Sequence, residues 1–251
     1  MKHQRNRGWA AILATLVLVG LGSLTISHKA SAAAEGKITG TVKLDGTAPH
    51  MKGIEMSKDP VCDKAHAGNP AHSENVVVGT GGGLENVVLY ISEGLSASEL
   101  NAKPTQVPIF DQKGCMYTPH VLAMDVGQEF KVETSDPTAH NIHPEPNPLT
   151  GNIPWNQSQP PGAAPVVKSW KTPEMIHVKC NIHPWMQGYF AVLRTNHYAV
   201  TGEDGAYTLP ELPPGKYTVT AWHELYGTQS REITIGGSET QTVNFLFYAK
   251  P

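Results

Sequence analysis

The stretch Cys180-Asn-Ile-His183-Pro-Trp-Met186 places a thiol, an imidazole and a thioether within seven residues. A further donor lies forty residues upstream, in His140-Asn-Ile-His143. Two histidines, one cysteine and one weakly bound methionine are the ligand set of a blue-copper electron-transfer site, in which the sulfurs favour Cu(I) and the imidazoles accept both oxidation states. The sequence therefore predicts that two distant stretches fold together around one soft metal ion.

The order of these motifs is similar to that of a known family. Tyr117-Thr-Pro-His-Val-Leu-Ala-Met-Asp-Val-Gly-Gln, then His140-Asn-Ile-His and Cys180-x-x-His-Pro-x-Met-x-Gly, resembles an amicyanin- or plastocyanin-type cupredoxin over about residues 105–195. The short loop with proline after its histidine is most similar to amicyanin. The resemblance implies one copper ion and four ligands, which are His140, Cys180, His183 and Met186. It also implies that Asn141 braces the thiolate loop by hydrogen bonding.

Some assignments around this loop stay open. His143 shares the motif and is the alternative to His140, and zinc accepts the same cysteine and histidine donors as copper. His183 is expected to leave one ring edge near solvent as the route for electrons. Trp185 beside it either forms part of a hydrophobic docking patch or packs over the loop.

The first residues predict export. Three cations precede an apolar run that ends before Ala30-Ser31-Ala32, a small-residue cleavage site, so residues 1–32 resemble a signal peptide. An uncleaved anchor is the alternative, and no later segment is apolar enough to span a membrane. Removal of the signal takes away these three cations and Lys29, which changes the net charge from −3 to −7. A mildly acidic chain without a basic run argues against a nucleic-acid partner. The mature protein is expected to be periplasmic or secreted.

The three cysteines of an exported chain leave an odd one. If Cys180 holds metal, Cys62 and Cys115 are free to form a disulfide. The alternative is two reduced, buried thiols.

Short strand-like runs between Gly, Pro, Asn and Asp clusters predict an all-β fold of sandwiches. Only residues 96–100 suggest a turn of helix. The proline-rich stretch between residues 144 and 173 is expected to form no regular sheet.

A second sandwich is expected at the C-terminus. Thr201-Gly-Glu-Asp-Gly-Ala-Tyr-Thr-Leu, followed by Pro213-Pro-Gly-Lys-Tyr-Thr-Val, resembles a carboxypeptidase regulatory-like, or prealbumin-like, domain of the carbohydrate-binding-like folds and places it at 197–251. Strands within 36–100 look like the opening strands of the same sandwich. The hypothesis is a cupredoxin domain (105–195) inserted into, or docked on, a smaller sandwich made from both chain ends. The alternative is a cupredoxin that starts near Gly36 and is followed by a simple C-terminal domain.

The motifs predict no enzyme, because nucleophile-elbow, zinc-protease and phosphate-binding motifs are all missing from the sequence. The leading expectation is an electron carrier that serves a redox protein. The alternatives are a polysaccharide- or protein-binding module, with copper absent or only structural, and copper storage or delivery. His120 and His223 have two interpretations, as ligands of a second metal ion or as hydrogen-bonded histidines within a sandwich.

Overall fold

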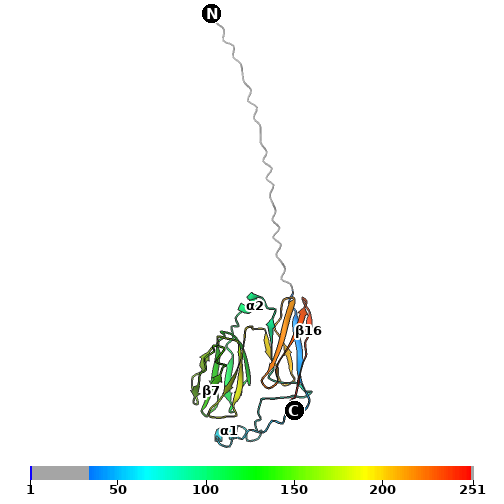
Figure 1. Ribbon diagram of the computed structural model, residues 1–251. Helices are drawn as coiled ribbons and strands as arrows, with labels where there is room; N and C mark the ends of the chain where they lie inside the picture. Colours follow the sequence, from blue (N-terminus) through cyan, green and yellow to red (C-terminus); the bar gives the residue numbers. More distant parts are fainter. Residues whose placement is uncertain (2–33, 250–251) are drawn as a thin grey trace. The chain divides into compact units, whose positions relative to one another are not determined.

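Strands dominate the fold, and the predicted all-β class is confirmed (Figure 1). The computed structural model describes Met1 and residues 34–249, so the expected export signal, apart from Met1, lies outside the described residues. Two short helices interrupt the strands, α1 (Pro60–Ala65) and α2 (Ala97–Asn101). Within the described part of the chain, no helix has the length and apolar character needed to cross a membrane.

The middle of the chain forms two facing sheets, here called the site sandwich. One sheet has the order β5-β11-β10-β7-β8 and the other β4-β3-β6-β9. Its strands are β3 (Ile109–Lys113), β4 (Met116–Thr118), β5 (Val121–Asp125), β6 (Phe130–Thr134), β7 (His140–Glu145), β8 (Gln157–Gln159), β9 (Val166–Lys168), β10 (Glu174–Lys179) and β11 (Gln187–Leu193). Phe110, Phe130 and Phe190 meet at centroid distances of 4.8 Å and fill the space between the sheets.

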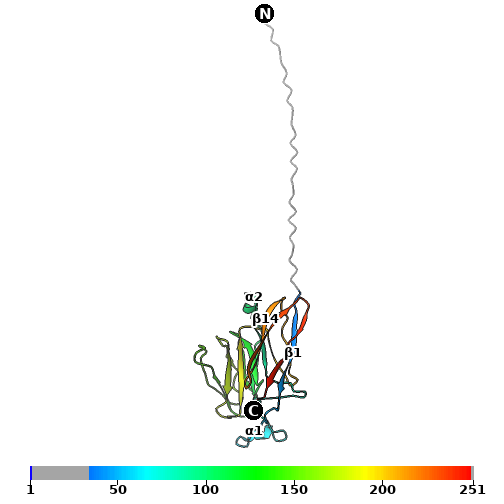
Figure 2. The same ribbon diagram turned by 45° about the vertical axis from the view of Figure 1, so that its right-hand side comes forward.

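Strands from both chain ends build the second pair of sheets, the terminal sandwich (Figure 2). Its strands are β1 (Lys37–Asp45), β2 (Val88–Glu93), β12 (Tyr198–Val200), β13 (Ala206–Thr208), β14 (Gly215–His223), β15 (Gly227–Ile235), β16 (Thr240–Thr242) and β17 (Phe245–Tyr248). In one sheet β1 pairs with β13, β16 and β17, and in the other β2 lies between β12 and β14. The two strands that precede the site sandwich therefore complete sheets whose other strands follow it.

The predicted turn at Asp204-Gly205 shows why glycine is needed there. Gly205 has φ of +70°, and a Cβ atom on it would lie 2.2 Å from the carbonyl oxygen of Val42. Its own carbonyl accepts a hydrogen bond from the Val42 N–H at 2.8 Å. A side chain at this position would force β1 away from the turn.

The proline-rich stretch departs from prediction, because it contains β8 and β9. Both are three-residue strands placed between prolines, so no ladder position requires an N–H that proline lacks. The buried Gln159 side chain anchors β8, since its amide donates to the Val132 carbonyl at 3.1 Å and accepts from Gln112 at 2.7 Å. The expectation of no regular sheet was therefore wrong.

Residues 46–87, here called the connecting segment, join β1 to β2 and contain α1. Asp59 caps α1 by accepting hydrogen bonds from the N–H groups of Val61 and Cys62, and Pro60 occupies the first helical turn. Cys62 is completely buried in the core of the site sandwich. This helix therefore packs against the site sandwich, although β1, which precedes it, belongs to the terminal one.

His223 is a buried histidine whose protonation opposes folding. Burial, reinforced by repulsion from His120, lowers the pKa of His223 to about 4, and its Nδ1 accepts a hydrogen bond from the Leu225 N–H at 3.1 Å. The unfolded chain takes up this proton near pH 6.5 but the folded chain does not, so stability falls as pH drops from about 6.5 to about 4, by at most about 3 kcal/mol. Urea unfolding at pH 7 and pH 4.5 should show His223→Gln to be less sensitive to acid than the wild type. An equal loss in both proteins would contradict this assignment.

Candidate metal centre

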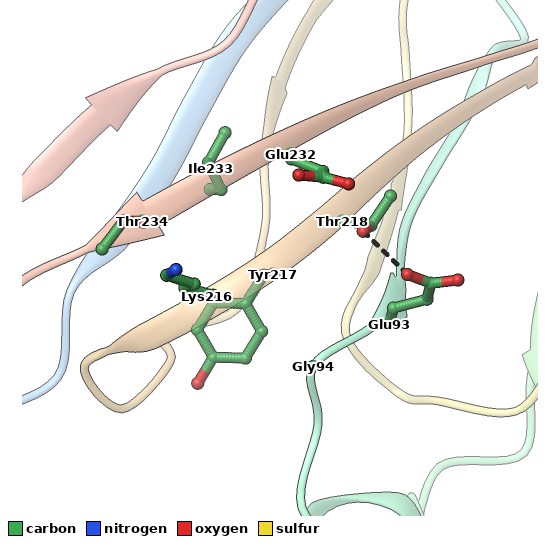
Figure 3. A pocket seen from close by; sticks show the side chains of 8 residues that line it. All are labelled: Glu93, Gly94, Lys216, Tyr217, Thr218, Glu232, Ile233 and Thr234. Atoms are coloured by element: carbon green, nitrogen blue, oxygen red, sulfur yellow. Dashed lines mark hydrogen bonds between the residues drawn. The ribbon is translucent and has the colours of Figure 1, made fainter.

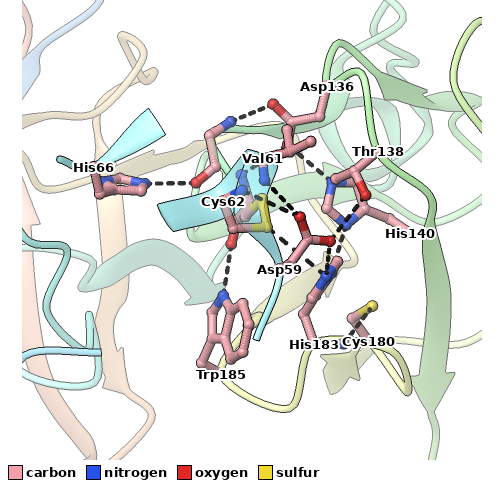
Figure 4. Close-up of a disulfide and its surroundings, with 12 residues drawn as sticks. Asp59, Val61, Cys62, His66, Asp136, Thr138, His140, Cys180, His183 and Trp185 are labelled. Atoms are coloured by element: carbon pink, nitrogen blue, oxygen red, sulfur yellow. Dashed lines mark hydrogen bonds and ion pairs between the residues drawn. A yellow bond between two sulfur atoms is a disulfide. The ribbon is translucent and has the colours of Figure 1, made fainter. Parts of the chain in front are cut away.

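Three predicted ligands converge at one end of the site sandwich (Figure 4). His140 opens β7, Cys180 follows the end of β10, and His183 lies in the loop before β11. One donor atom from each lies within 4.8 Å of the other two, and all three residues are buried. The Nδ1 atoms of the two histidines are 2.9 Å apart. Two imidazoles therefore present the same ring nitrogen to a position that also faces the cysteine sulfur.

The loop that carries Cys180 is closed by its own backbone. The Cys180 N–H donates to the Met186 carbonyl at 3.1 Å, and the Met186 N–H donates to the His183 carbonyl at 2.9 Å. Met186 is completely buried in the core of the site sandwich. The loop thus holds the fourth predicted ligand against the core that surrounds the three converging donors.

Backbone donors surround the cysteine sulfur. The N–H groups of Asn141 and His183 point to Cys180 Sγ at 3.5 and 3.4 Å. Burial opposes the thiolate, but these contacts and the hydrogen bond from His140 outweigh it and lower the pKa of Cys180. The pocket therefore favours the form of sulfur that binds metals.

Asn141 joins the two stretches that carry the ligands. Its Oδ1 accepts a hydrogen bond from the Asn181 N–H at 2.6 Å and lies 3.3 Å from Cys180 Sγ. Its amide donates to Asn156 at 2.6 Å, and its carbonyl accepts from the buried Tyr117 hydroxyl at 2.7 Å. Asn141 therefore fixes the Cys180 loop relative to β7.

Carboxylates hold the far nitrogens of both histidines. His140 Nε2 lies 2.9 Å from Asp136 Oδ2, and His183 Nε2 lies 3.1 Å from Asp59 Oδ2. Burial disfavours a charged His140, but Asp136 and Cys180 raise its pKa to about 9. For His183, burial and repulsion from His140 prevail over Asp59 and lower the pKa. A carboxylate on one ring nitrogen fixes the ring and makes the other nitrogen a better metal donor.

The expected solvent-facing edge of His183 is wrong. His183 is 3 % exposed, because the N-terminus of α1 covers its outer edge with Asp59 and with Cys62, whose sulfur lies 3.8 Å from Nε2. Thr138 also donates to Asp59 at 3.0 Å and ties α1 to the loop before β7. Asp59 and Asp136 were not among the predicted site residues, although Asp-Pro at the start of α1 is a helix-start signal.

A disulfide joins Cys62 of α1 to Cys115 in the turn between β3 and β4, with 5.5 Å between the Cα atoms. Cys180 is left as the free cysteine. Asp136 accepts hydrogen bonds from the N–H groups of Gly114 and Cys115, both at 2.7 Å, so the same turn also positions the partner of His140.

Trp185 packs over the site. Its ring lies 4.9 Å from that of His183, and its Nε1 donates to the Cys115 carbonyl at 3.0 Å. The half-buried indole therefore covers the His183 ring.

The remaining histidines lie apart from the three donors. Nδ1 of His143 donates to Asn181 Oδ1 at 3.1 Å, and His143 is not in the converging group. His120 pairs with Glu224, which follows His223 in the sequence.

A groove on the terminal sandwich bears on polysaccharide binding (Figure 3). It runs along β14 and β15 beside Glu93, Lys216, Glu232 and Thr234. Its aromatic residue, Tyr217, is only 5 % exposed. Within residues 34–249 no tryptophan is exposed, so the groove offers no row of aromatic rings for a sugar to stack on.

Comparisons with known proteins give the following similarities. Residues 190–247 match the model of the carboxypeptidase regulatory-like domain. A Cu-containing nitrite reductase from Thermus scotoductus SA-01 is 18% identical, with a TM-score of 0.31, over 41% of this chain and 25% of that chain. An oxidised amicyanin variant is 17% identical, with a TM-score of 0.30, over 42% and 98%. A purple cupredoxin from Nitrosopumilus maritimus is 15% identical, with a TM-score of 0.29, over 34% and 99%. The chain thus spans a quarter of the nitrite reductase. No curated protein matches its sequence.

Proposed function

We propose that this chain is an exported electron-relay protein whose site holds one copper ion. His140, Cys180 and His183 would be its principal ligands and Met186 a weaker one. The observation that carries the proposal is the convergence of two Nδ1 atoms and one sulfur in a buried pocket. Copper, when bound, would supply one-electron exchange between Cu(I) and Cu(II).

The residues around the donors suit electron exchange because they limit movement of the ligand side chains. Carboxylates fix both imidazoles, Asn141 ties the two ligand-bearing stretches together, and the disulfide anchors the covering helix. A site that rearranges little exchanges electrons at low energetic cost. Burial of the three donors also keeps water from the open positions that hydrolytic metal sites need. We therefore propose electron transfer without catalysis.

The partner would be another redox protein that docks on the loop before β11. Ile182 is 50 % exposed and Pro184 is also exposed, while His183 between them is covered. Trp185, in contact with His183, continues this apolar surface. Electrons would therefore pass through the edge of the loop and the indole rather than through an exposed imidazole. The disulfide agrees with an oxidising compartment, periplasmic or extracellular.

Copper loading followed by spectroelectrochemistry tests the proposal. The Cu(II) protein should show a strong visible charge-transfer band and narrow copper hyperfine splitting by EPR. The band should disappear and return over repeated one-electron cycles without loss of metal. A colourless protein would contradict the copper relay, and release of copper on reduction would favour storage or delivery.

A further inference from the structure

Two buried polar atoms face each other without hydrogen-bond partners, away from the candidate metal centre. They are Nδ1 of His120 and Oε2 of Glu74, which lie 3.7 Å apart. The His120 side chain is 3 % exposed and that of Glu74 is 35 % exposed. Buried polar atoms without partners are uncommon in folded proteins, so this pair requires a physical explanation.

The other ring nitrogen of His120 is already engaged. Nε2 hydrogen-bonds to Glu224, whose side chain is 5 % exposed and also accepts from the Asn75 amide at 3.3 Å. Glu224 therefore fixes the ring with Nδ1 directed at Glu74. His140 and His183 show the same arrangement, with a carboxylate on Nε2 and Nδ1 directed at the metal position. Metal-binding histidines are usually held by a partner on their second nitrogen in this way.

Negative charge accumulates around His120. Burial raises the pKa of Glu74; the charge of His120 opposes this rise, and the charges of Glu85 and Glu224 add to it. Burial also raises the pKa of Glu85. Burial opposes a charged His120, but Glu224 and Glu74 outweigh it and raise its pKa. Among the ion pairs of the described residues, those that involve lysine lie elsewhere, so no lysine or arginine balances this charge.

We propose that Glu74 and His120 bind a divalent cation of the zinc type, with Oε2 of Glu74 and Nδ1 of His120 as its protein donors. Zinc binds histidine nitrogen and carboxylate oxygen at about 2.0–2.2 Å, so two donor atoms 3.7 Å apart suit one ion between them. Glu74 is partly exposed, so the ion reaches the site from solvent and water completes its coordination.

The ion would link three parts of the fold. Glu74 belongs to the connecting segment, His120 to the turn between β4 and β5, and Glu224 to the turn after β14 of the terminal sandwich. An ion that binds only the folded chain stabilises it by mass action. This site is separate from the copper centre and does not depend on the proposed electron relay.

Equilibrium dialysis of the copper-loaded protein against ZnCl₂, with metal analysis, tests the proposal. The wild type should retain one zinc per chain besides copper. Glu74→Gln and His120→Gln should weaken zinc binding by more than tenfold, and Glu224→Gln by about 10–100-fold through loss of the supporting carboxylate. Affinity should also fall as pH decreases, because protons compete for His120.

The control is Glu129→Gln, which removes an exposed carboxylate and should leave zinc binding unchanged. Circular dichroism and urea unfolding report whether each variant has folded, and the partly exposed Glu74 provides a variant that leaves the core intact. In Cys180→Ser, which cannot form the thiolate copper site, adding Glu74→Gln should still remove one bound zinc. A wild type that retains no additional zinc, or zinc binding that Glu74→Gln does not weaken, would overturn the proposal.

Discussion

Cys180→Ser should abolish the visible band of the copper-loaded protein. The hydroxyl keeps the size of the side chain but removes the soft sulfur, so the charge-transfer transition and the preference for Cu(I) are lost together. Copper binding should weaken by more than the ~10–100-fold that follows from loss of a supporting residue. Absorption spectra and a competitive chelator titration measure the two effects.

His143→Asn is the matched control for this variant. It alters a histidine of the same motif that hydrogen-bonds to Asn181 and lies outside the converging donors. The band and the affinity should persist in His143→Asn and be lost in His140→Asn. If His143→Asn lost the band instead, His143 rather than His140 would be the ligand from β7.

The local motifs carried most of the information about the site. Spacing within residues 180–186 requires a tight loop, and Asn141 lies next to His140, so short-range constraints in the sequence were enough to predict the roles of these residues. The chain has three cysteines, so once Cys180 is assigned to the metal only Cys62 and Cys115 are left to pair, as they do. The all-β class followed from turn residues and short alternating runs.

The covering of His183 could not be predicted in this way. Asp59 and His183 are 124 residues apart, and the hydrogen bond between them depends on how α1 packs. A helix of six residues has too little periodicity to be recognised, and its position follows from the buried Cys62. The short strands β8 and β9 were not predicted for a related reason. Three residues have only a weak local preference for strand, and pairing of β8 with β7 and of β9 with β6 outweighs it.

Removing the disulfide should have the largest effect on stability. In the chain-entropy model, a bridge across 53 residues stabilises the fold by about 4 kcal/mol, because it restricts the unfolded chain. The double variant Cys62→Ala/Cys115→Ala should therefore lose about this amount in urea unfolding. Its transition should also become steeper, since the unfolded chain without the bridge is less restricted and exposes more surface. A loss below about 1 kcal/mol would contradict the model.

The same double variant should uncover His183, because the bridge fastens α1 over the site. Hydrogen exchange in residues 59–66 and chemical modification of His183 should both accelerate. Asp59→Ala is the informative comparison: it keeps the bridge but removes the hydrogen bonds to His183, Thr138 and the start of α1. A buried partner left unpaired costs about 1–3 kcal/mol, so this variant should be the less destabilised of the two. If His183 became equally accessible in both variants, the hydrogen bonds of Asp59 rather than the covalent link would hold the cover in place. If it stayed protected in both, apolar packing of the segment before α1, through the buried Met56, would suffice to close the site.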